Sequence, residues 1–323
     1  MEYRNFGHTG LKVSELCLGT MQFGWTADED LSHKILSTAF EAGINFIDTA
    51  DVYSRWVEGN PGGVAEAIIG KWIKQSNIPR DQLVLATKVR GKMGSGPNDE
   101  GLSRKHIMLA VDASLRRLGI DYIDLYQVHA YDEHTPIEET LQALSDLVQQ
   151  GKVRYIGCSN FPAWRLIEAI WTSKLHHFSR FDSIQPHYNL AHRSEFEREL
   201  ADVCRTYTIA VIPYSPLAGG FLTNKYQPNQ VEPESARLGG VKRRYFNKKS
   251  WALHSTLENV SQQMEKTISQ VALAWLLTDP LITSPIIGPR NLEQLSDNLG
   301  SIGLRLIQER KNELDAASIW QEV

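Results

Sequence analysis

The sequence contains only three cysteines, Cys17, Cys158 and Cys204, and they lie far apart along the chain. Three scattered cysteines are too few for a disulfide framework or a structural zinc site, which favours a reducing compartment. The chain also lacks a run of about 18 apolar residues, and its polar start, Met1 to Gly10, has no apolar core. We therefore expect a cytoplasmic protein with no membrane partner.

The sequence has no strong excess of charge of either sign. It contains 34 Lys and Arg against 38 Asp and Glu, which gives a formal net charge of -4. No global basic field is available for nucleic acid, so a small molecule is the expected partner. The dinucleotide fingerprint G-x-G-x-x-G is absent as well, which disfavours an open, doubly wound sheet.

The 323 residues, 42% of them hydrophobic, suffice for a large buried core and alternate short β-rich runs with amphipathic helical patterns. Eight strands, each followed by a helix, predict a closed (β/α)8 TIM barrel in a single domain over residues 1–323. A hairpin is expected before the barrel, over Tyr3–Phe6 and Leu11–Ser14, and an extra C-terminal helix after it, over Leu306–Trp320. The predicted strands are Leu16–Leu18, Asn45–Asp48, Leu83–Thr87, Ile123–His129, Val153–Cys158, Ser183–Gln185, Ile209–Tyr214 and Pro285–Gly288, and the predicted helices lie near 31–42, 63–75, 103–118, 136–150, 162–174, 193–207, 252–278 and 291–299.

Some helix starts carry a local signal. Thr135-Pro136-Ile137-Glu138 offers an N-cap, a first-turn proline and the glutamate of a capping box, and Asn291 to Gln294 has the same form. The long segment Asn224–Lys249 is expected to be a loop. Loops of this kind set specificity in barrels.

Three consecutive predicted strands each end in a polar residue, and a fourth polar residue lies in the loop after the first of these strands. Asp48 ends the second strand, with Tyr53 in the loop after it, Lys88 ends the third and His129 the fourth. In a parallel barrel the functional groups lie at these carboxyl ends, so the four side chains can converge. A buried Asp–Lys pair could merely hold the end of the barrel together, with Tyr53 and His129 as core residues, and any one of the four alone would be explained in this way. Four such residues at neighbouring strand ends favour a catalytic role instead.

The four residues together can form a device that donates a proton. A phenol has a pKa near ~10 and is a poor acid at neutral pH unless a nearby cation stabilises its phenolate. We predict that Tyr53 is a general acid, that Lys88 lowers its pKa and that Asp48 keeps Lys88 charged and oriented. His129 would hydrogen-bond a substrate carbonyl oxygen beside the phenol.

At Asp48, Tyr53, Lys88 and His129 the chain resembles the aldo-keto reductase superfamily, whose Asp, Tyr, Lys and His stand at the same strand ends. The resemblance extends over nearly the whole chain, from the N-terminal hairpin to the helix after the eighth strand. It implies an NADPH-dependent reductase of aldehydes or ketones on a (β/α)8 barrel. In that family hydride passes from C4 of the nicotinamide to the carbonyl carbon, while the tyrosine, here Tyr53, protonates the oxygen.

Other strand ends carry groups suited to NADPH or NADP+. Ser159, Asn160 and Gln185 place a hydroxyl and two amides where a nicotinamide carboxamide can be held, and the resemblance implies this role. Tyr214 begins a loop of small residues that a pyrophosphate can approach closely, and the resemblance implies that its ring stacks on the nicotinamide. Further expected cofactor contacts are Gly19, Thr20, Met21, Ser215, Pro216, Leu217 and Gly219.

The segment after the eighth strand predicts a phosphate site. A helix N-terminus attracts anions, and Arg290, one residue before the expected N-cap Asn291, adds a bidentate donor that suits an adenosine 2′-phosphate. Gln294 and Asn298 lie near one face of that helix, where they could hydrogen-bond an adenine. The family's Gly-x-Arg-x3-Gln-x3-Asn arrangement is matched from Gly288 onward and implies a preference for NADPH over NADH.

Three aromatic residues in strand-end loops are candidates for substrate contact: Trp25, Trp56 and Tyr131. Two other functions use the same barrel. A metal-dependent hydrolase could use His129, Asp132 and His134, but the first strand end lacks a His-x-His pair and Lys88 would repel a cation, so no metal is expected. An NADPH-sensing regulatory subunit would bind the cofactor with little turnover, whereas the four filled positions favour turnover.

Overall fold

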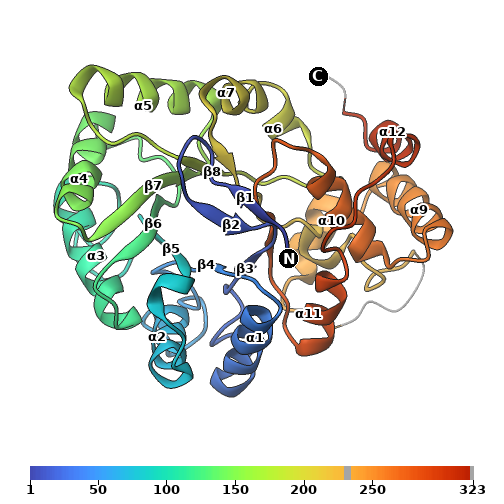
Figure 1. Cartoon of the computed structure of the whole chain (residues 1–323), viewed down its shortest axis with the longest axis horizontal. Helices are drawn as coiled ribbons and strands as arrows, with labels where there is room; N and C mark the ends of the chain where they lie inside the picture. Colours follow the sequence, from blue (N-terminus) through green and yellow to red (C-terminus); the bar gives the residue numbers. More distant parts are fainter. Residues whose placement is uncertain (229–233, 321–323) are drawn as a thin grey trace.

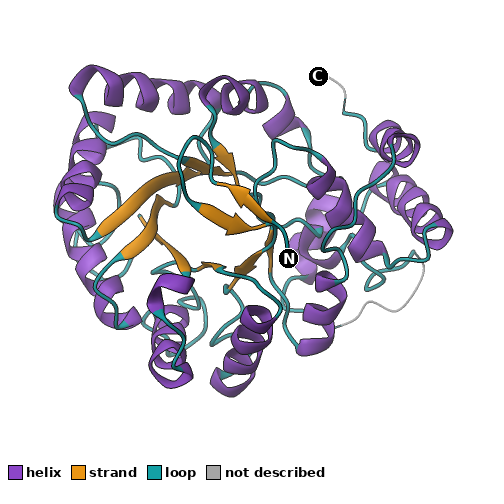
Figure 2. Ribbon diagram, in the orientation of Figure 1, coloured by secondary structure: helices purple, strands orange, loops and turns teal. Residues whose placement is uncertain are grey.

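The computed structural model describes residues 1–228 and 234–320, and at its centre parallel strands curl into a barrel surrounded by helices (Figures 1 and 2). Hydrogen bonds join eight strands in the order β10-β3-β4-β5-β6-β7-β8-β9. The predicted α/β barrel is confirmed. Its strands are β3 (Cys17–Gly19), β4 (Phe46–Asp48), β5 (Val84–Val89), β6 (Ile123–Val128), β7 (Val153–Ser159), β8 (Ser183–Gln185), β9 (Ala210–Val211) and β10 (Ile286–Ile287).

The barrel closes between β9 and the segment that leads into β10. A parallel bridge joins Val211 to Ile282, the Thr283 N–H donates to the Val211 carbonyl at 2.8 Å, and the Ile286 N–H donates to the Pro213 carbonyl at 2.9 Å. These two strands are shorter than the sequence predicts because the chain pairs irregularly here. Tyr214, predicted as the last residue of the seventh strand, lies beyond the regular part of β9.

Most strand residues are buried, as in other parallel barrels, where one face of the sheet is inside and helices cover the other. All six residues of β5 are buried, including the polar Thr87 and Lys88. A polar group in such a strand needs a partner inside the protein. The partners of Lys88 form the site described below, and the Thr87 hydroxyl donates to Glu66 at 2.6 Å.

The helices lie on the outside of the barrel, and most begin and end near their predicted limits (Figure 1). The predicted helix over 193–207 is two helices, and so is the one over 252–278, because Glu265 has φ 52° and a right-handed helix cannot continue through this left-handed backbone. The predicted loop Asn224–Lys249 contains a further helix, α8, while its residues 229–233 lie outside the described part. The helices are α1 (Glu29–Glu41), α2 (Val64–Ser76), α3 (Arg104–Leu118), α4 (Ile137–Gln149), α5 (Ala163–His176), α6 (Ser194–Glu197), α7 (Leu200–Tyr207), α8 (Leu238–Tyr245), α9 (Lys248–Gln263), α10 (Ile268–Thr278), α11 (Leu292–Leu299) and α12 (Gln308–Ala317), with short 3-10 turns η1 (Arg80–Gln82) and η2 (Ala218–Gly220).

Neither of the two predicted capping boxes forms, although one of the two predicted N-caps is present. The N-cap of α4 is Pro136, with no side-chain hydrogen bond, because the Thr135 hydroxyl donates to Asp132 at 2.9 Å instead. Asn291 is the N-cap of α11, as predicted, and its side chain accepts from the Gln294 N–H at 2.8 Å. The Gln294 side chain, however, accepts from the N–H of Arg290, one residue before the cap.

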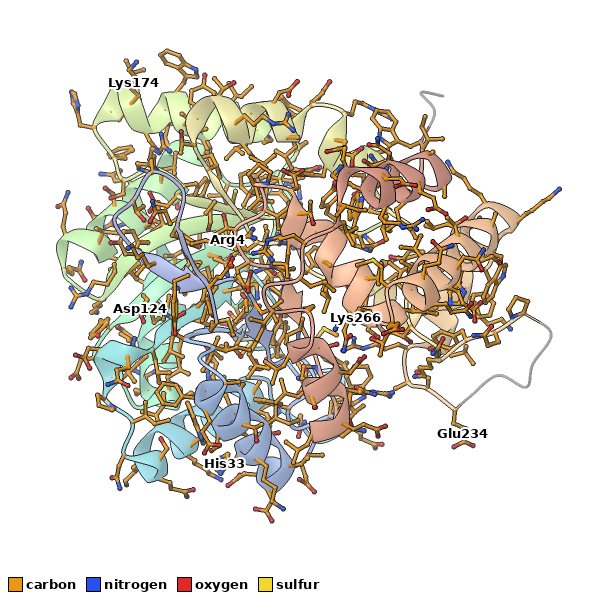
Figure 3. The ribbon with its side chains drawn as sticks, turned by 45° about the vertical axis from the view of Figure 1, so that its right-hand side comes forward. Arg4, His33, Asp124, Lys174, Glu234 and Lys266 are labelled. Atoms are coloured by element: carbon orange, nitrogen blue, oxygen red, sulfur yellow. The ribbon has the colours of Figure 1, made fainter. Side chains whose placement is uncertain are left out.

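The predicted N-terminal hairpin is present as β1 (Tyr3–Asn5) and β2 (Lys12–Ser14), and it covers the amino-terminal end of the barrel. Phe6 is fully buried there. Arg4, labelled in Figure 3, donates to the carbonyl of Leu277 at 2.7 Å and to that of Ile282. With this end closed, the carboxyl ends of the strands are left for a site.

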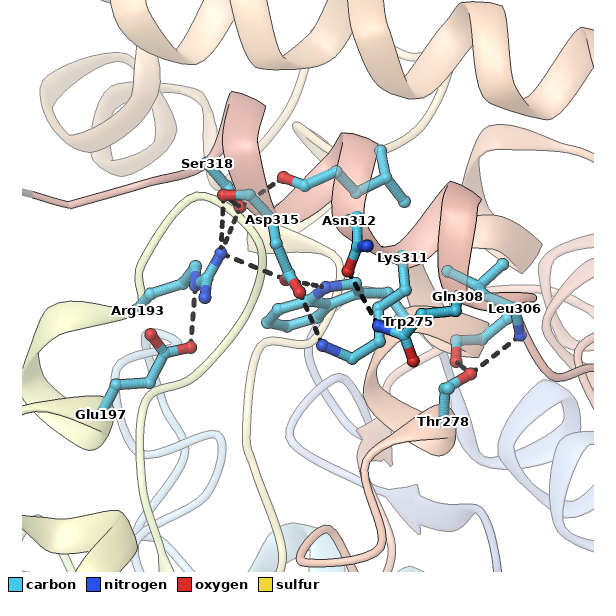
Figure 4. Close-up of polar contacts among 12 residues, drawn as sticks. Arg193, Glu197, Trp275, Thr278, Leu306, Gln308, Lys311, Asn312, Asp315 and Ser318 are labelled. Carbon is cyan, nitrogen blue, oxygen red and sulfur yellow. Dashed lines mark hydrogen bonds and ion pairs between the residues drawn. The ribbon is translucent and has the colours of Figure 1, made fainter.

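The extra C-terminal helix, α12, is also present; it packs against α9 and makes polar contacts with Trp275 of α10 and with Arg193, the N-cap of α6 (Figure 4). Asp315 accepts from the Trp275 indole at 2.8 Å and pairs with Lys311 at 2.6 Å, and Arg193 donates to the Ser318 hydroxyl at 2.7 Å. The helix therefore holds Arg193, at the end of the loop after β8, in place. Within residues 1–228 and 234–320, none of the helices combines the length and the hydropathy needed to cross a bilayer.

Candidate active site

The structure brings the predicted Asp48, Lys88 and Tyr53 into direct contact. Lys88 Nζ donates to Asp48 Oδ2 at 2.5 Å, to the Thr49 carbonyl at 2.8 Å and to the Tyr53 hydroxyl oxygen at 3.0 Å. Asp48 pairs with Ala86 across the neighbouring strands β4 and β5, and Lys88, two positions further along β5, is on the same face as Ala86. The loop after β4 turns Tyr53 back over the ammonium. All three hydrogen-bonding positions of the ammonium are thus used.

Asp48 has further partners that the sequence reasoning missed. Its Oδ1 accepts from the side-chain amide of Gln127 at 3.0 Å and from that of Gln185 at 2.9 Å. Gln127 is a polar residue within the apolar strand β6, two positions before His129. Because alternate residues of a strand share a face, that spacing was the signal that could have found it.

Burial and charge shift the pKa values of this cluster in opposing directions. Burial lowers the pKa of Lys88, but Asp48 and Tyr53 outweigh it, so the pKa is raised overall and the amine stays charged. Burial raises the pKa of Tyr53, the nearby Lys88 lowers it, and the sum is upward. Lys88 therefore lowers the pKa of Tyr53, as predicted. The net pKa is nevertheless raised, so the prediction of an unusually acidic phenol is wrong.

His129 follows β6 and lies beside the phenol. Its ring centroid is 6.0 Å from that of Tyr53, at an interplanar angle of 72°. Burial, together with the positive charges of Lys88 and Arg90, lowers the pKa of His129 to about 3. The imidazole is therefore neutral near pH 7 and suited to hydrogen bonding rather than to carrying charge.

A cavity of about 820 Å³ opens over these residues at the carboxyl ends of the strands. Its volume lies within the range of cofactor and ligand pockets. Tyr53, Asp48 and His129 line it, whereas Lys88 is fully buried behind them. All the predicted cofactor residues line the same cavity: Gly19, Thr20, Met21, Ser159, Asn160, Gln185, Tyr214, Ser215, Pro216, Leu217, Gly219, Gly288, Arg290, Gln294 and Asn298.

Hydrogen bonds order one end of the cavity around Asn160. The Tyr214 hydroxyl donates to Asn160 Oδ1 at 3.0 Å, and Asn160 Nδ2 donates to the His129 carbonyl at 2.9 Å and to the Ser159 hydroxyl at 3.1 Å. Asn160 has φ 55°, a left-handed conformation that asparagine tolerates better than most residues. The phenol ring of Tyr214 is thereby fixed beside the strand ends that carry Ser159 and Gln185.

The other end of the cavity is cationic, and two of its cations were not predicted. Lys225 and Arg237, in the segment after β9, line the cavity together with Arg290. Burial and the two arginines lower the pKa of Lys225 to about 8, and its ammonium donates to the Ser235 hydroxyl at 2.7 Å. Three cations near the N-terminus of α11 form a region suited to phosphate groups. The basic residues in the predicted loop Asn224–Lys249 were the feature of the sequence that could have indicated these two cations.

The three predicted substrate residues do not line this cavity. Trp25 and Trp56 meet edge to face at 5.4 Å between ring centroids, and Trp56 lies 6.3 Å from the Tyr53 ring. These two rings therefore lie beside Tyr53 without lining the cavity. Tyr131 packs instead on Phe161 at 6.1 Å, outside the cavity lining.

Asp132, one of the residues of the hydrolase alternative, is engaged outside the cavity. Asp132 accepts from the N–H groups of His134, at 3.0 Å, and of Leu102, at 2.8 Å, which makes it part of a turn. In the part of the chain that the structure describes, no three His, Cys, Asp or Glu side chains gather as a metal site would require.

Comparison with known proteins identifies the class of protein that this fold and site define. Residues 15–319 match the Aldo/keto reductase family. The chain is 39% identical over 313 residues to the Uncharacterized oxidoreductase YrpG of Bacillus subtilis, covering 96% of this chain and 93% of that protein. It is 34% identical over 334 residues to the Versiconal hemiacetal acetate reductase of Aspergillus parasiticus, covering 96% and 94%. The Putative aryl-alcohol dehydrogenase C977.14c of Schizosaccharomyces pombe is 35% identical over 336 residues, covering 95% and 93%.

The chain belongs to the aldo/keto reductase family, and it is an oxidoreductase. The resemblance stated from Asp48, Tyr53, Lys88 and His129 is confirmed at the level of the family.

Proposed function

We propose that the protein reduces aldehyde or ketone carbonyls to alcohols with NADPH as the hydride donor. The observation that carries this proposal is the contact of 3.0 Å between Lys88 Nζ and the Tyr53 hydroxyl on a cavity large enough for a dinucleotide. A protonated phenol next to a fixed positive charge can give up its hydrogen while the charge stabilises the phenolate that remains.

Each residue of the cluster has a separate task. Tyr53 donates its proton to the carbonyl oxygen as that oxygen gains negative charge. Lys88 favours the phenolate left behind, and Asp48 keeps Lys88 charged at 2.5 Å. Neutral His129 is placed to donate a hydrogen bond to the same oxygen, which orients the carbonyl before the reaction.

The cavity residues fit a nicotinamide adenine dinucleotide phosphate. Ser159, Asn160 and Gln185 offer the hydroxyl and amide groups that a carboxamide needs, and Arg290 with the N-terminus of α11 suits a 2′-phosphate. Lys225 and Arg237 add positive charge near Arg290. When bound, the cofactor supplies the hydride that reaches the carbonyl carbon.

The test is consumption of NADPH, followed by absorbance, with a panel of aldehydes, ketones, quinones and sugar phosphates. The wild-type protein should oxidise NADPH with at least one member of the panel. The Tyr53→Phe variant removes only the transferable proton, so the turnover number should fall by about 10²–10⁴-fold while NADPH still quenches or shifts protein fluorescence as before. Binding of NADPH without turnover in the wild type would instead indicate the regulatory alternative, and full activity of Tyr53→Phe would refute the acid.

A further inference from the structure

The ring of Tyr214 is backed by two histidines that the proposed chemistry does not use. The rings of Tyr214 and His187 are stacked, with centroids 5.1 Å apart and an interplanar angle of 11°. His192 stacks on the other face of His187 at 4.0 Å and 22°. One face of Tyr214 is therefore covered by His187, which leaves the other face for the cavity that Tyr214 lines.

His187 is held in its plane from the side. Its Nε2 lies 2.9 Å from the Tyr245 hydroxyl, with which it shares a hydrogen bond, and 3.5 Å from Asn189 Nδ2. Asn189, which is fully buried, also donates to the Ser215 carbonyl at 3.0 Å, next to Tyr214. The backbones of His187 and Tyr214 form a parallel bridge, so the two rings leave neighbouring segments in the same direction.

The imidazole of His187, in the middle of the stack, is uncharged near neutral pH. Burial lowers the pKa of His187 to about 3, helped by His192 and by the positive charge of Arg244. A neutral imidazole is flat and polarisable and brings no charge to the back of the phenol ring. The stacked geometry of His187 thus suits a side chain that fixes the plane of the Tyr214 ring.

Tyr245 connects this ring stack to helix α8, in the segment after β9. It is the last residue of α8, whose N-cap is the cavity-lining Arg237. In the middle of α8, Val241 packs so closely on Gly219 that a Cβ there would lie 2.9 Å from a Val241 methyl group. The helix therefore touches the small-residue loop after β9, the cationic end of the cavity and, through Tyr245, the ring stack.

We propose that His187 is a positioning residue that sets the plane of Tyr214 as the platform for a nicotinamide ring, and that Tyr245 couples this platform to α8. The proposal rests on the proposed function, since it assumes that NADPH occupies the cavity. Without a flat ring behind it, Tyr214 can tilt, and a nicotinamide resting on it is then misplaced for hydride transfer, which depends on near-attack geometry.

The decisive comparison is between a flat and a branched replacement. His187→Leu introduces a branched side chain of similar size and loses both the flat ring and the hydrogen bond, whereas His187→Phe keeps a flat ring and loses only the hydrogen bond. His187→Leu should weaken NADPH binding by roughly 3- to 10-fold, the worth of one aromatic stack, and lower the single-turnover rate by about 10-fold with little change in the KM for the carbonyl. His187→Phe should restore both within about 3-fold.

A second ligand separates positioning from general damage. Adenosine 2′,5′-bisphosphate lacks the nicotinamide, so its affinity, measured by fluorescence or calorimetric titration, should be the same in His187→Leu and the wild type. Tyr245→Phe removes one hydroxyl and should reduce the rate in the wild-type background, with no further effect in His187→Phe, where there is no ring nitrogen to bond. His176→Leu is the matched control, because His176 stacks on Phe178 at 5.4 Å outside the cavity.

The outcomes are distinguishable. Wild-type affinity and rate in His187→Leu would overturn the proposal, and so would equal weakening of NADPH and the bisphosphate, or a loss in His187→Phe as large as in His187→Leu. If the wild type itself neither binds NADPH nor reduces any carbonyl, the proposed function fails first and the platform fails with it.

Discussion

The ammonium of Lys88 lies 2.5 Å from Asp48 Oδ2, and neither side chain is more than 2% exposed. Removing two charges from water is unfavourable, and the attraction between them offsets this only when the remaining hydrogen-bonding positions are filled. Here they are filled, by Thr49 and Tyr53 on the ammonium and by the amides of Gln127 and Gln185 on the carboxylate. Every hydrogen-bonding partner of the pair is thus supplied from within the protein.

The first prediction concerns the stability of this pair. Asp48→Ala leaves a buried ammonium without its carboxylate and should lower the free energy of unfolding by about 3–5 kcal/mol. Lys88→Met should also destabilise, but by less, because the two amides still satisfy Asp48. In the double variant Asp48→Ala/Lys88→Met neither charge of the pair remains, so its loss should be well below the sum of the losses in Asp48→Ala and Lys88→Met. Denaturant titration measures all of these, and additive losses would contradict the prediction.

The second prediction concerns the dependence of reduction on pH. The pKa of His129 is lowered to about 3 and the pKa of Tyr53 is raised, so between about pH 6 and about pH 9 the imidazole stays neutral and the phenol stays protonated. The kcat/KM for the carbonyl should therefore show no inflection near the usual histidine pKa of about 6.5. His129→Gln should lower kcat/KM without changing the shape of the profile. An inflection between about pH 6 and about pH 7 that disappears in His129→Gln would assign a titrating role to the histidine instead.

The barrel and the core of the site were predictable from the sequence because both depend on local patterns. In a parallel barrel the last residue of each apolar run must lie at the same end, so Asp48, Lys88 and His129 had to meet there. Gln127 was missed because a polar residue inside a strand does not reveal which buried partner it has. Its contact with Asp48 joins residues 79 positions apart in the chain.

The predictions that were wrong depend on opposing interactions whose balance the sequence does not show. Thr135 has the residues of a capping box around it, but Asp132, three positions earlier, accepts its hydroxyl hydrogen. The net pKa of Tyr53 could not be predicted either, because the sequence shows the neighbouring charge and not the depth of burial that opposes it. Helix α8 was missed because its Gly-Gly pair and cluster of basic residues are typical of a loop.

The third prediction concerns the choice of cofactor. Arg290 lines the cavity directly before the N-cap of α11. A charge-assisted bond to a 2′-phosphate is lost in Arg290→Ala, so the Kd for NADPH should rise by roughly 10- to 100-fold while that for NADH changes little. Arg290→Lys keeps the charge and should lose less. Fluorescence titration with both cofactors tests this, and equal effects on NADPH and NADH would refute the assignment.

The last prediction concerns a buried carboxyl group at the closed end of the barrel. Asp182 lies 3.4 Å from Nε2 of His8 in the hairpin turn, and burial raises its pKa to about 7, against the N–H of Ile156 and the charge of Arg180. Burial and Arg180 also lower the pKa of His8, so this histidine is a weak counter-ion near neutral pH.

The sign of the effect follows from the difference between the folded and unfolded states. In the unfolded chain Asp182 loses its proton near pH ~4, while in the folded protein it keeps the proton up to about pH 7. Stability is therefore lost as the pH rises through this window, by at most about 1.4 kcal/mol per pH unit, and does not change further above it. Asp182→Asn cannot ionise, so its stability relative to the wild type should increase from about pH 4 to about pH 7 and then level off.

Urea titration of both proteins across this range measures the difference directly, and His8→Gln serves as the control for the hairpin contact. Because burial is the main cause of the shift, His8→Gln should keep the same pH window as the wild type. A stability difference between Asp182→Asn and the wild type that stays constant from about pH 4 to about pH 8 would show that Asp182 ionises normally in the folded protein.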